Sequence, residues 1–276
     1  MRLQLSCHDA LLIFSALGLI CGFVAGIVIV LFRLLVESGQ LAILPGGGAE
    51  NYEALPPFLR FVLPIFGGLL LGLIFLRYAK GLHVLGIPRV MERLIYHQGH
   101  LSMRSFILRF FGAAIAIISG HSVGREGSHV FLSAASDSLL GQYLSLPNNS
   151  IRTLVSYGTA AGISASFDTP LAGVIFALEV VMMEYTLVSF IPIMLAAVSA
   201  NSVSLMLFDG ERVFDIAIIQ LGSLHELVFV LLLGLVAGTV SAAYVHLIQL
   251  IFDKTQSMAF WARKCRGKNN YPVWGC

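Results

Sequence analysis

Long runs of apolar residues dominate the chain. A helix that spans the hydrocarbon core of a bilayer needs about 20 mostly apolar residues. Three uncharged runs reach that length, and a fourth reaches it if its ends tilt or extend into the headgroup region: residues 10–32, 185–208, 227–252 and 61–76. This pattern predicts an all-α, polytopic membrane protein.

The stretch 106–167 is also apolar, but glycine and proline interrupt it repeatedly. Most of the pieces that result there and just after it are too short to cross a membrane upright: residues 106–119, 128–144, 151–163 and 170–183. Broken segments at membrane depth are tolerated where protein or a water-filled cavity covers the exposed backbone. In transporters they mark substrate sites near the midplane. We expect tilted and broken helices around such a site, with a bundle of kinked helices as the alternative.

The distribution of charge predicts the orientation of the spans. Six basic residues and one acid lie between Arg77 and Arg109, whereas residues 34–59 contain three glutamates and neither Lys nor Arg. Because basic loops stay in the cytoplasm, we expect residues 77–109 and the basic tail inside, and the acidic segments 34–59 and 209–226 outside. The first span then runs from inside to outside, and the span 227–252 runs in the opposite direction.

Two of the predicted spans share the pattern GLxxGxV, beginning at Gly18 and at Gly234. Similar helices of opposite orientation indicate an inverted-topology repeat. The two motifs are 216 residues apart, so two full repeats need about 430 residues. We therefore predict a first repeat at residues 1–222, and the first helix of a truncated second repeat with its basic tail at residues 223–276. We expect such a chain to insert into membranes by itself without forming a complete transport pathway.

Composition excludes several other classes of protein. The chain has 276 residues, of which 57% are hydrophobic and 12% are charged, whereas soluble domains carry about 25% charged residues. A disordered chain, a nucleic-acid-binding protein and an ordinary cytosolic enzyme do not fit these values. The net charge of +2 indicates no partner by itself, the four cysteines are scattered, and nothing in the sequence predicts a cofactor.

Charged residues within the apolar stretch are the first candidates for function. Gly124-Arg125-Glu126-Gly127 separates two apolar runs and precedes a predicted helix, and ionisable residues within membranes are usually functional. A helix N-terminus offers free N–H groups and partial positive charge, so it can bind an anion. The Glu126 carboxylate would compete for that position and act as a gate. The alternative is a buried Arg125–Glu126 ion pair that holds two helices together.

Two other segments have the pattern of a capped helix start. Gly86-Ile87-Pro88 and Asp168-Thr169-Pro170 place proline in the first helical turn, where its missing N–H costs nothing. The polar residues before Pro170 predict an N-cap. Simple capping without any ligand is the alternative for both segments.

A metal site is disfavoured. Glu126 and His129 form an ExxH pair, but the HExxH motif of metalloproteases needs a second histidine where this chain has Arg125. An intramembrane metalloprotease is thus a weak alternative, and we predict neither a metal site nor an enzyme.

Together these motifs resemble those of the chloride channel and chloride/proton antiporter family, known as CLC. Gly124–Gly127 is similar to its GREGP motif, with Ser128 in place of proline, and Gly86-Ile87-Pro88 is similar to the end of its GSGIP motif. A third match runs from Ala160-Ala161-Gly162 to the segment Phe167-Asp168-Thr169-Pro170-Leu171-Ala172-Gly173.

The resemblance implies a CLC-type inverted repeat in a homodimer whose helix N-termini point at chloride near the middle of the membrane. It implies that Glu126 is the gate. It also implies that the anion sites are formed by Arg125, Glu126, Gly127, Leu85, Gly86, Ile87 and Pro88. The expected partners are the chloride ion, the lipid bilayer and a second copy of the chain, without nucleic acid. The expected location is a cell membrane, the inner membrane of a bacterium.

Two departures from the family pattern affect the expected activity. Leu85 replaces the serine that binds chloride in the family, which removes a hydroxyl donor. Glu179 matches the glutamate that precedes the internal proton-relay glutamate of the antiporters, and the relay position itself is Val180, which leaves Glu179 as a weak candidate for a proton relay. An apolar residue there favours a passive channel of the voltage-gated type. A chloride/proton antiporter and a truncated, transport-inactive membrane fragment are the alternatives.

Overall fold

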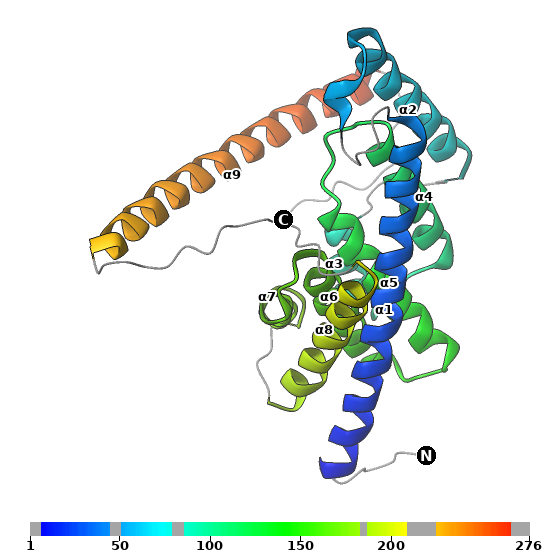
Figure 1. The fold of residues 1–276 in the computed structure, drawn as a ribbon, viewed down its shortest axis with the longest axis vertical. Helices are drawn as coiled ribbons and strands as arrows, with labels where there is room; N and C mark the ends of the chain where they lie inside the picture. Colours follow the sequence, from blue (N-terminus) through cyan, green and yellow to red (C-terminus); the bar gives the residue numbers. More distant parts are fainter. Residues whose placement is uncertain (1–6, 45–50, 79–85, 183–186, 209–224, 266–276) are drawn as a thin grey trace. The chain divides into compact units, whose positions relative to one another are not determined.

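The fold is helical throughout the residues that the computed structural model describes, which are 7–44, 51–78, 86–182, 187–208 and 225–265 (Figure 1). These ranges contain no strand, so the prediction of an all-α protein is confirmed. The chain divides into two compact units, Met1–Phe214 and Asp215–Cys276. The division into sequence repeats at residue 222 stays a prediction, because compactness does not test it.

Each predicted apolar run corresponds to a helical element. The first unit contains α1 (Cys7–Ile43), the 3-10 turn η1 (Tyr52–Ala54), α2 (Pro57–Tyr78), α3 (Ile87–Tyr96), α4 (Met103–Ile118), α5 (Glu126–Tyr143), α6 (Asn148–Phe167), α7 (Pro170–Phe176), the π-helical segment η2 (Ala177–Met182) and α8 (Leu187–Leu207). The described helix of the second unit is α9 (His225–Cys265).

Helix α1 is longer than the sequence predicts. Its 37 residues span about 55 Å at 1.5 Å per residue, which exceeds the ~30 Å hydrocarbon core. It must therefore tilt or project from the membrane. The segment 34–59, predicted as an outer loop, is in fact helical as far as Ile43 and again from Pro57.

Side-chain contacts explain the extension of α1. Arg33 and Glu37 form an ion pair of 2.6 Å at the i,i+4 spacing that supports a helix. One turn further on, the Gln40 amide donates a hydrogen bond to the Tyr52 hydroxyl, which donates in turn to the Ile117 carbonyl at 2.8 Å. The end of α1 is thus fixed against η1 and the end of α4.

Helices α1 and α8 lie side by side and run in the same direction, as the predicted orientation of both spans requires (Figure 1). Small residues form the contact and let the two backbones approach closely. The facing pairs are Gly18 with Pro192, Gly22 with Ala196, and Gly26 with Ala200.

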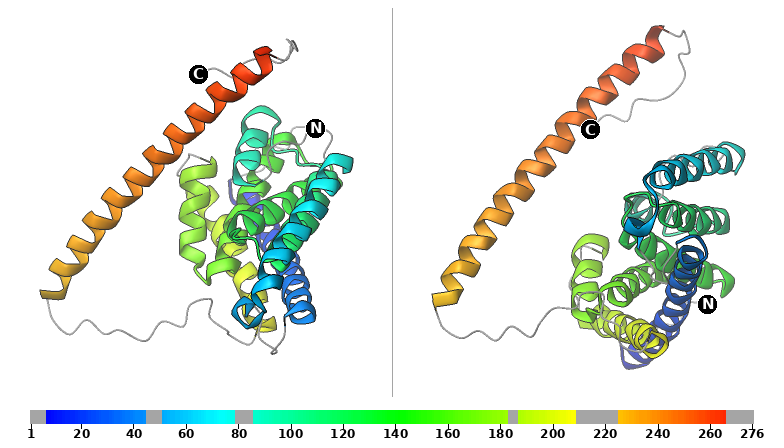
Figure 2. Two further views of the ribbon diagram at one scale, coloured as in Figure 1. Left: turned by 90° about the horizontal axis from the view of Figure 1, so that it is seen from above. Right: turned by 45° about the horizontal axis from the view of Figure 1, so that its top comes forward.

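Helices α5 and α6 form an antiparallel pair in the interior of the first unit (Figure 2). Every residue of α5 from Ser128 to Ser138 is buried. Over this stretch the helix therefore has no solvent-exposed face. The core around the pair includes the fully buried side chains of Phe131 and Leu132 from α5 and of Tyr157 from α6.

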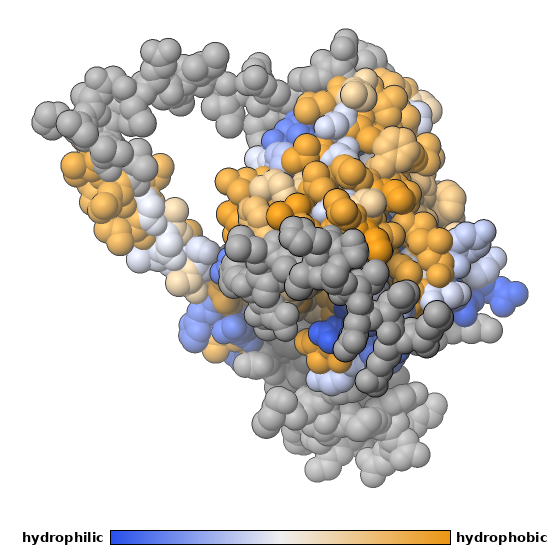
Figure 3. Space-filling view, turned by 90° about the horizontal axis from the view of Figure 1, so that it is seen from below, coloured by the Kyte–Doolittle hydropathy of each residue, from blue (hydrophilic) through white to orange (hydrophobic). Residues whose placement is uncertain are grey.

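The described helices of both units have surfaces that suit a bilayer. Four described segments are long and apolar enough to cross a membrane: Leu11–Ile43, Pro57–Tyr78, Ser189–Leu207 and Leu231–Ile251. Helix α2 buries Gly67 alone and exposes side chains such as Phe61, Phe66 and Leu69. Figure 3 shows apolar side chains over much of the described surface on the face that it views. Lipid is the environment in which such a surface is stable.

The helix that begins at Pro170 changes its geometry after seven residues. Helix α7 ends at Phe176 and continues directly as the π-helical segment η2. Together they form the short apolar element Pro170–Met182, as the sequence predicts for this broken part of the chain.

Candidate anion-binding site at the starts of α3 and α5

The start of α5 leaves backbone N–H groups available. The N–H groups of Ser128 and His129 bond to the carbonyl of Arg125, the N-cap residue, at 3.1 and 3.0 Å. Those of Glu126 and Gly127 have no backbone acceptor among the described residues. Free N–H groups and the helix dipole together favour an anion at this position.

Glu126 is the first residue of α5, and its side chain is exposed. Its carboxylate turns back against Gly124. The alternative of a buried Arg125–Glu126 ion pair is therefore wrong, because Glu126 is not buried. The role of Glu126 as a gate stays a prediction.

The start of α3 has the geometry that the sequence predicts. Gly86 is the N-cap at φ 116°, ψ −160°, a region that favours glycine. Its carbonyl accepts hydrogen bonds from the N–H groups of Arg89 and Val90 at 3.0 and 3.3 Å. Pro88 lies in the first turn, as expected. Leu85 lies outside the described residues.

Arg109 of α4 connects these two helix starts. A Cβ added to Gly86 would stand 3.8 Å from Nη2 of Arg109, and a Cβ added to Gly127 would stand at the same distance from that atom. The guanidinium group therefore lies between the starts of α3 and α5. Its Nε is buried and has no hydrogen-bond partner among the described residues. Two helix N-termini that share one guanidinium form a cationic centre suited to an anion.

The sequence analysis missed Arg109 as a site residue. It counted Arg109 among the basic residues of the cytoplasmic segment, whereas the structure places it within α4, six residues after Met103. The signal was present in the sequence. Phe106-Ile107-Leu108 precedes Arg109 and Phe110-Phe111 follows it, and a charge inside an apolar run is a functional candidate.

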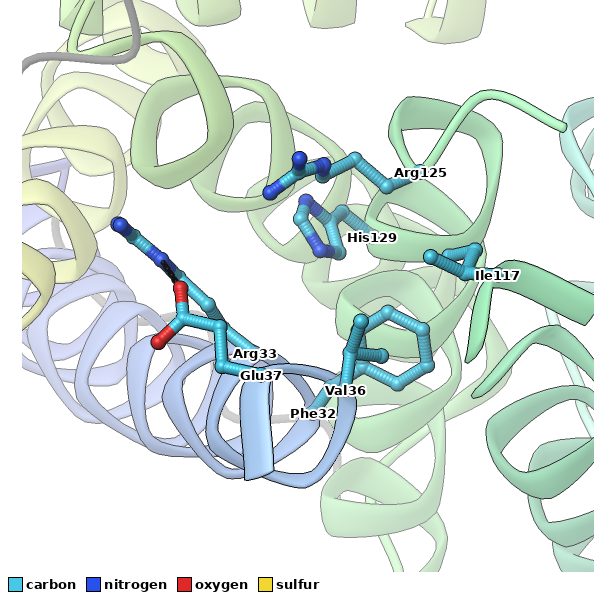
Figure 4. Close-up of a pocket in the computed structure, with 7 residues that line it drawn as sticks. All are labelled: Phe32, Arg33, Val36, Glu37, Ile117, Arg125 and His129. Atoms are coloured by element: carbon cyan, nitrogen blue, oxygen red, sulfur yellow. Dashed lines mark hydrogen bonds and ion pairs between the residues drawn. The ribbon is translucent and has the colours of Figure 1, made fainter. Parts of the chain in front are cut away.

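A small pocket lies beside the start of α5, between α1, α4 and α5 (Figure 4). It has room for about one water molecule. The Arg33–Glu37 pair from α1 faces Arg125 and His129 from α5 across it. The remaining lining residues are Phe32, Val36 and Ile117.

The hydrogen bonds of His129 define its tautomer. Its Nδ1 lies 2.6 Å from the Ser166 hydroxyl, which donates its own hydrogen to the Gly162 carbonyl. Nδ1 must therefore be the donor, and Nε2 is left as an acceptor. The ring is used to join α5 to α6, and the described residues contain no group of three potential metal ligands. Neither observation supports the metalloprotease alternative.

The motif Asp168-Thr169-Pro170 has a packing role. Asp168 is the left-handed C-cap of α6, at φ 54°, and the N-cap of α7 is Thr169, whose side chain makes no capping hydrogen bond. A polar residue therefore occupies the N-cap of α7 and Pro170 begins the helix, as the sequence predicts, but the side-chain hydrogen bond of a cap is not formed. Gly173 lies against α6, where an added Cβ would stand 3.2 Å from the Ser164 nitrogen.

Glu179 and Val180 both belong to η2. The Glu179 side chain is exposed, and that of Val180 is half-buried. A proton-relay role for Glu179 stays a prediction.

Known proteins resemble this chain over most of its length. A family profile described as "Voltage gated chloride channel" matches residues 67–266. A putative chloride channel protein ClcB-like of Ralstonia nicotianae is 33% identical over 206 residues, which cover 73% of this chain and 48% of the relative. The H(+)/Cl(-) exchange transporter ClcA of Vibrio cholerae is 28% identical over 241 residues, which cover 86% of this chain and 52% of the relative.

Solved structures agree with these relatives. A CLC-type fluoride/proton antiporter matches with a TM-score of 0.65 and 26% identity, over 83% of this chain and 55% of that one. A slow cyanobacterial Cl-/H+ antiporter has the same fold, with a TM-score of 0.65 and 20% identity over 82% and 54%. The chain spans about half the length of the curated relatives that it matches. It is a multi-pass membrane protein, and it belongs to the CLC family, whose members are channels and transporters.

Proposed function

We propose that this chain forms part of a chloride pathway, in which the starts of α3 and α5 and the Arg109 side chain bind the anion. The observation that carries the proposal is the position of the Arg109 guanidinium, 3.8 Å from the Cβ positions of both Gly86 and Gly127. Neither glycine has a side chain that would fill the space beside the guanidinium. An anion there would meet one full positive charge and two helix dipoles.

Around this centre, we assign the anion-binding roles to the backbone of the two helix starts. At α5 they belong to Arg125, Glu126 and Gly127, whose turn carries the available N–H groups. At α3 they belong to Gly86 and Ile87, together with Leu85 from the preceding segment, and Pro88, which has no N–H, fixes the turn that presents them. Glu126 acts as the gate, because its carboxylate and a chloride ion compete for the same donors.

Passive conduction in a homodimer is the mode that we favour. The relay position of the antiporters is Val180 in this chain, and valine cannot carry a proton. The relative from Ralstonia nicotianae is named a chloride channel. The relative from Vibrio cholerae is named an exchange transporter, so chloride/proton exchange is the second candidate. The third is a chain that inserts into the membrane without transport.

Chloride binding to the purified chain tests the site directly. We expect ³⁵Cl line broadening by the wild-type protein in detergent, and chloride binding at least about tenfold weaker in Arg109→Gln. A hydrogen bond to a charged group contributes about 1.5–3 kcal/mol, and about 1.4 kcal/mol corresponds to tenfold. Arg104→Gln is the matched control, because Arg104 is an exposed arginine on the same helix. Equal binding by the two variants would refute the assignment of Arg109.

Flux from chloride-loaded vesicles tests the gate and the mode of transport. We expect no efflux from the chain alone, and efflux after fusion to the part of the Ralstonia relative that follows the matched region. In that fusion, Glu126→Gln should remove the pH dependence of chloride flux, since the neutral amide mimics a protonated gate. Proton movement in fixed ratio to chloride would identify an exchanger. A full pH response in the variant would show that Glu126 is not the gate.

A further inference from the structure

Asp137 carries a carboxyl group in the buried middle part of helix α5. It lies on α5, eleven residues after Glu126, and its exposed fraction is 0%. Neither carboxyl oxygen has a hydrogen-bond partner among the described residues. The chloride site and the family motifs leave this residue without a role.

Asp137 is enclosed by helices α1 and α6. From α1, the Cys21 thiol interacts with its carboxyl group, and this is the one titratable group among the described residues that does so. From α6, Gly158 approaches so closely that an added Cβ would stand 2.8 Å from Oδ2. Tyr157, the neighbour of Gly158, belongs to the same buried cluster as Cys21. The surrounding side chains of this cluster, among them Leu154, Ile193 and Ala196, are apolar and fully buried.

Such surroundings oppose a negative charge. An ionised carboxylate that is taken out of water needs an ion pair or several hydrogen bonds to compensate for lost hydration. The Cys21 thiol is the one titratable group among the described residues that interacts with the Asp137 carboxyl group, and a single weak S–H donor does not compensate for that loss. We propose that Asp137 is a proton-binding site inside the membrane, and that its carboxyl group holds a proton at neutral pH.

The ligand that fits this position is a proton rather than a metal ion. A sodium ion would need several oxygen ligands and room for its own volume, whereas the close approach of Gly158 leaves no such space beside Oδ2. A protonated carboxyl group needs one acceptor for its hydrogen. The Cys21 sulfur lies beside it, and a thiol sulfur can accept a weak hydrogen bond.

The residue that follows Asp137 makes polar contacts with another part of the chain. The next residue, Ser138, donates a hydrogen bond to the Gly99 carbonyl at 2.6 Å and accepts one from the Leu101 N–H at 2.9 Å. Both partners belong to the connection between α3 and α4, within the basic segment that is predicted to face the cytoplasm. Asp137 thus lies one residue from a polar contact with that connection.

Infrared spectroscopy of the complete chain in lipid at about pH 7 tests the site. An aspartic acid in water is ionised above about pH 4, so a protonated carboxyl band at pH 7 is diagnostic. We expect one carboxylic acid C=O band that shifts in D₂O and is absent from Asp137→Asn. Asp168→Asn is the matched control and should keep the band, because Asp168 is partly exposed at the C-cap of α6. Loss of a carboxylate band in Asp137→Asn would overturn the proposal.

Two further measurements keep the proposal testable if Asp137→Asn fails to fold. Cys21→Ser replaces the weak sulfur acceptor by a hydroxyl group of similar shape, so the C=O band should move, and an unmoved band would contradict the contact. Exchange of sodium for choline should leave the band unchanged, and a band that grows on sodium removal would identify a sodium site instead. These readouts do not depend on chloride transport, so they succeed or fail separately from the proposed function.

Discussion

Helices α1 and α9 share the GLxxGxV pattern, but their glycines have different surroundings. In α1, a Cβ added to Gly22 would stand 2.7 Å from the Cα of Ala196 in α8. In α9, Cβ atoms added to Gly234 and Gly238 would have no described atom of their own unit within 4 Å. Within its own unit none of the apolar span of α9 is buried, whereas 44% of that of α1 is buried within the first unit.

The comparison shows what the pattern encodes. Glycines four residues apart lie on one face of a helix and let a second backbone approach, but they stabilise nothing until that backbone is present. In α1 the approaching helix is α8. Helix α9 has the same kind of surface, and within the described part of its own unit no second helix covers it.

The largest expected effect comes from a bulky residue on the packed face. Gly22→Leu must displace the α8 backbone, because the obstacle is the main chain near Ala196. We expect a loss of about 3 kcal/mol or more, at the upper end of the cost of overpacking. Thermal unfolding in detergent, followed by circular dichroism, measures it. Gly238→Leu is the matched control and should leave the midpoint unchanged. Equal shifts of the unfolding midpoint in Gly22→Leu and Gly238→Leu would show that the glycine faces of α1 and α9 are packed alike.

A Gly→Ala substitution, which adds one methyl group, should destabilise α1 and stabilise α9. A Cβ on Gly26 would stand 3.1 Å from the Cα of Ala200 and 3.0 Å from the Cβ of Val203. Gly26→Ala should therefore destabilise the first unit by about 1 kcal/mol. Gly234→Ala meets nothing and should increase the helicity of α9, since alanine favours a helix by about 1 kcal/mol over glycine. If Gly26→Ala and Gly234→Ala both stabilised or both destabilised their helices, the proposed difference between the surroundings of α1 and α9 would be wrong.

A smaller effect is expected from the polar link between α6 and α8. The buried Ser164 hydroxyl donates to the Ala197 carbonyl at 2.7 Å, and such a bond contributes about 1 kcal/mol or less. Ser164→Ala should lower the unfolding midpoint slightly. Thr239→Ala in α9 removes an exposed hydroxyl that bonds to the Val236 carbonyl of its own helix, and it should have no measurable effect. A larger loss from Thr239→Ala would mean that α9 is packed through this face.

The sequence predicted the elements that depend on local patterns. Apolar runs located the helices, and the prolines at positions 88 and 170 marked two helix starts, since both signals act over a few residues. The extension of α1 was missed because Tyr52 and Ile117, which fix its end, come from distant parts of the chain.

The candidate site was predicted less completely, for the same reason. Its backbone part follows from motifs, but the position of Arg109 between two helix starts depends on how α3, α4 and α5 pack. Asp137 was missed because serines surround it in the sequence, and Ser-Asp-Ser has the appearance of an ordinary polar segment. Its burial follows from the contact between α5 and α6, where Gly158 of α6 lies against it.

The π-helical turn of η2 has a consequence for comparisons within the family. A π turn closes each hydrogen bond over one more residue than an α turn, so it accommodates one residue in excess of the regular helix. Side chains after the turn consequently point in directions that belong, in a regular helix, to their sequence neighbours. Glu179 and Val180 lie within this turn. Counting along a regular helix therefore does not apply beyond Phe176, and a residue there must be matched to a relative by its direction in space.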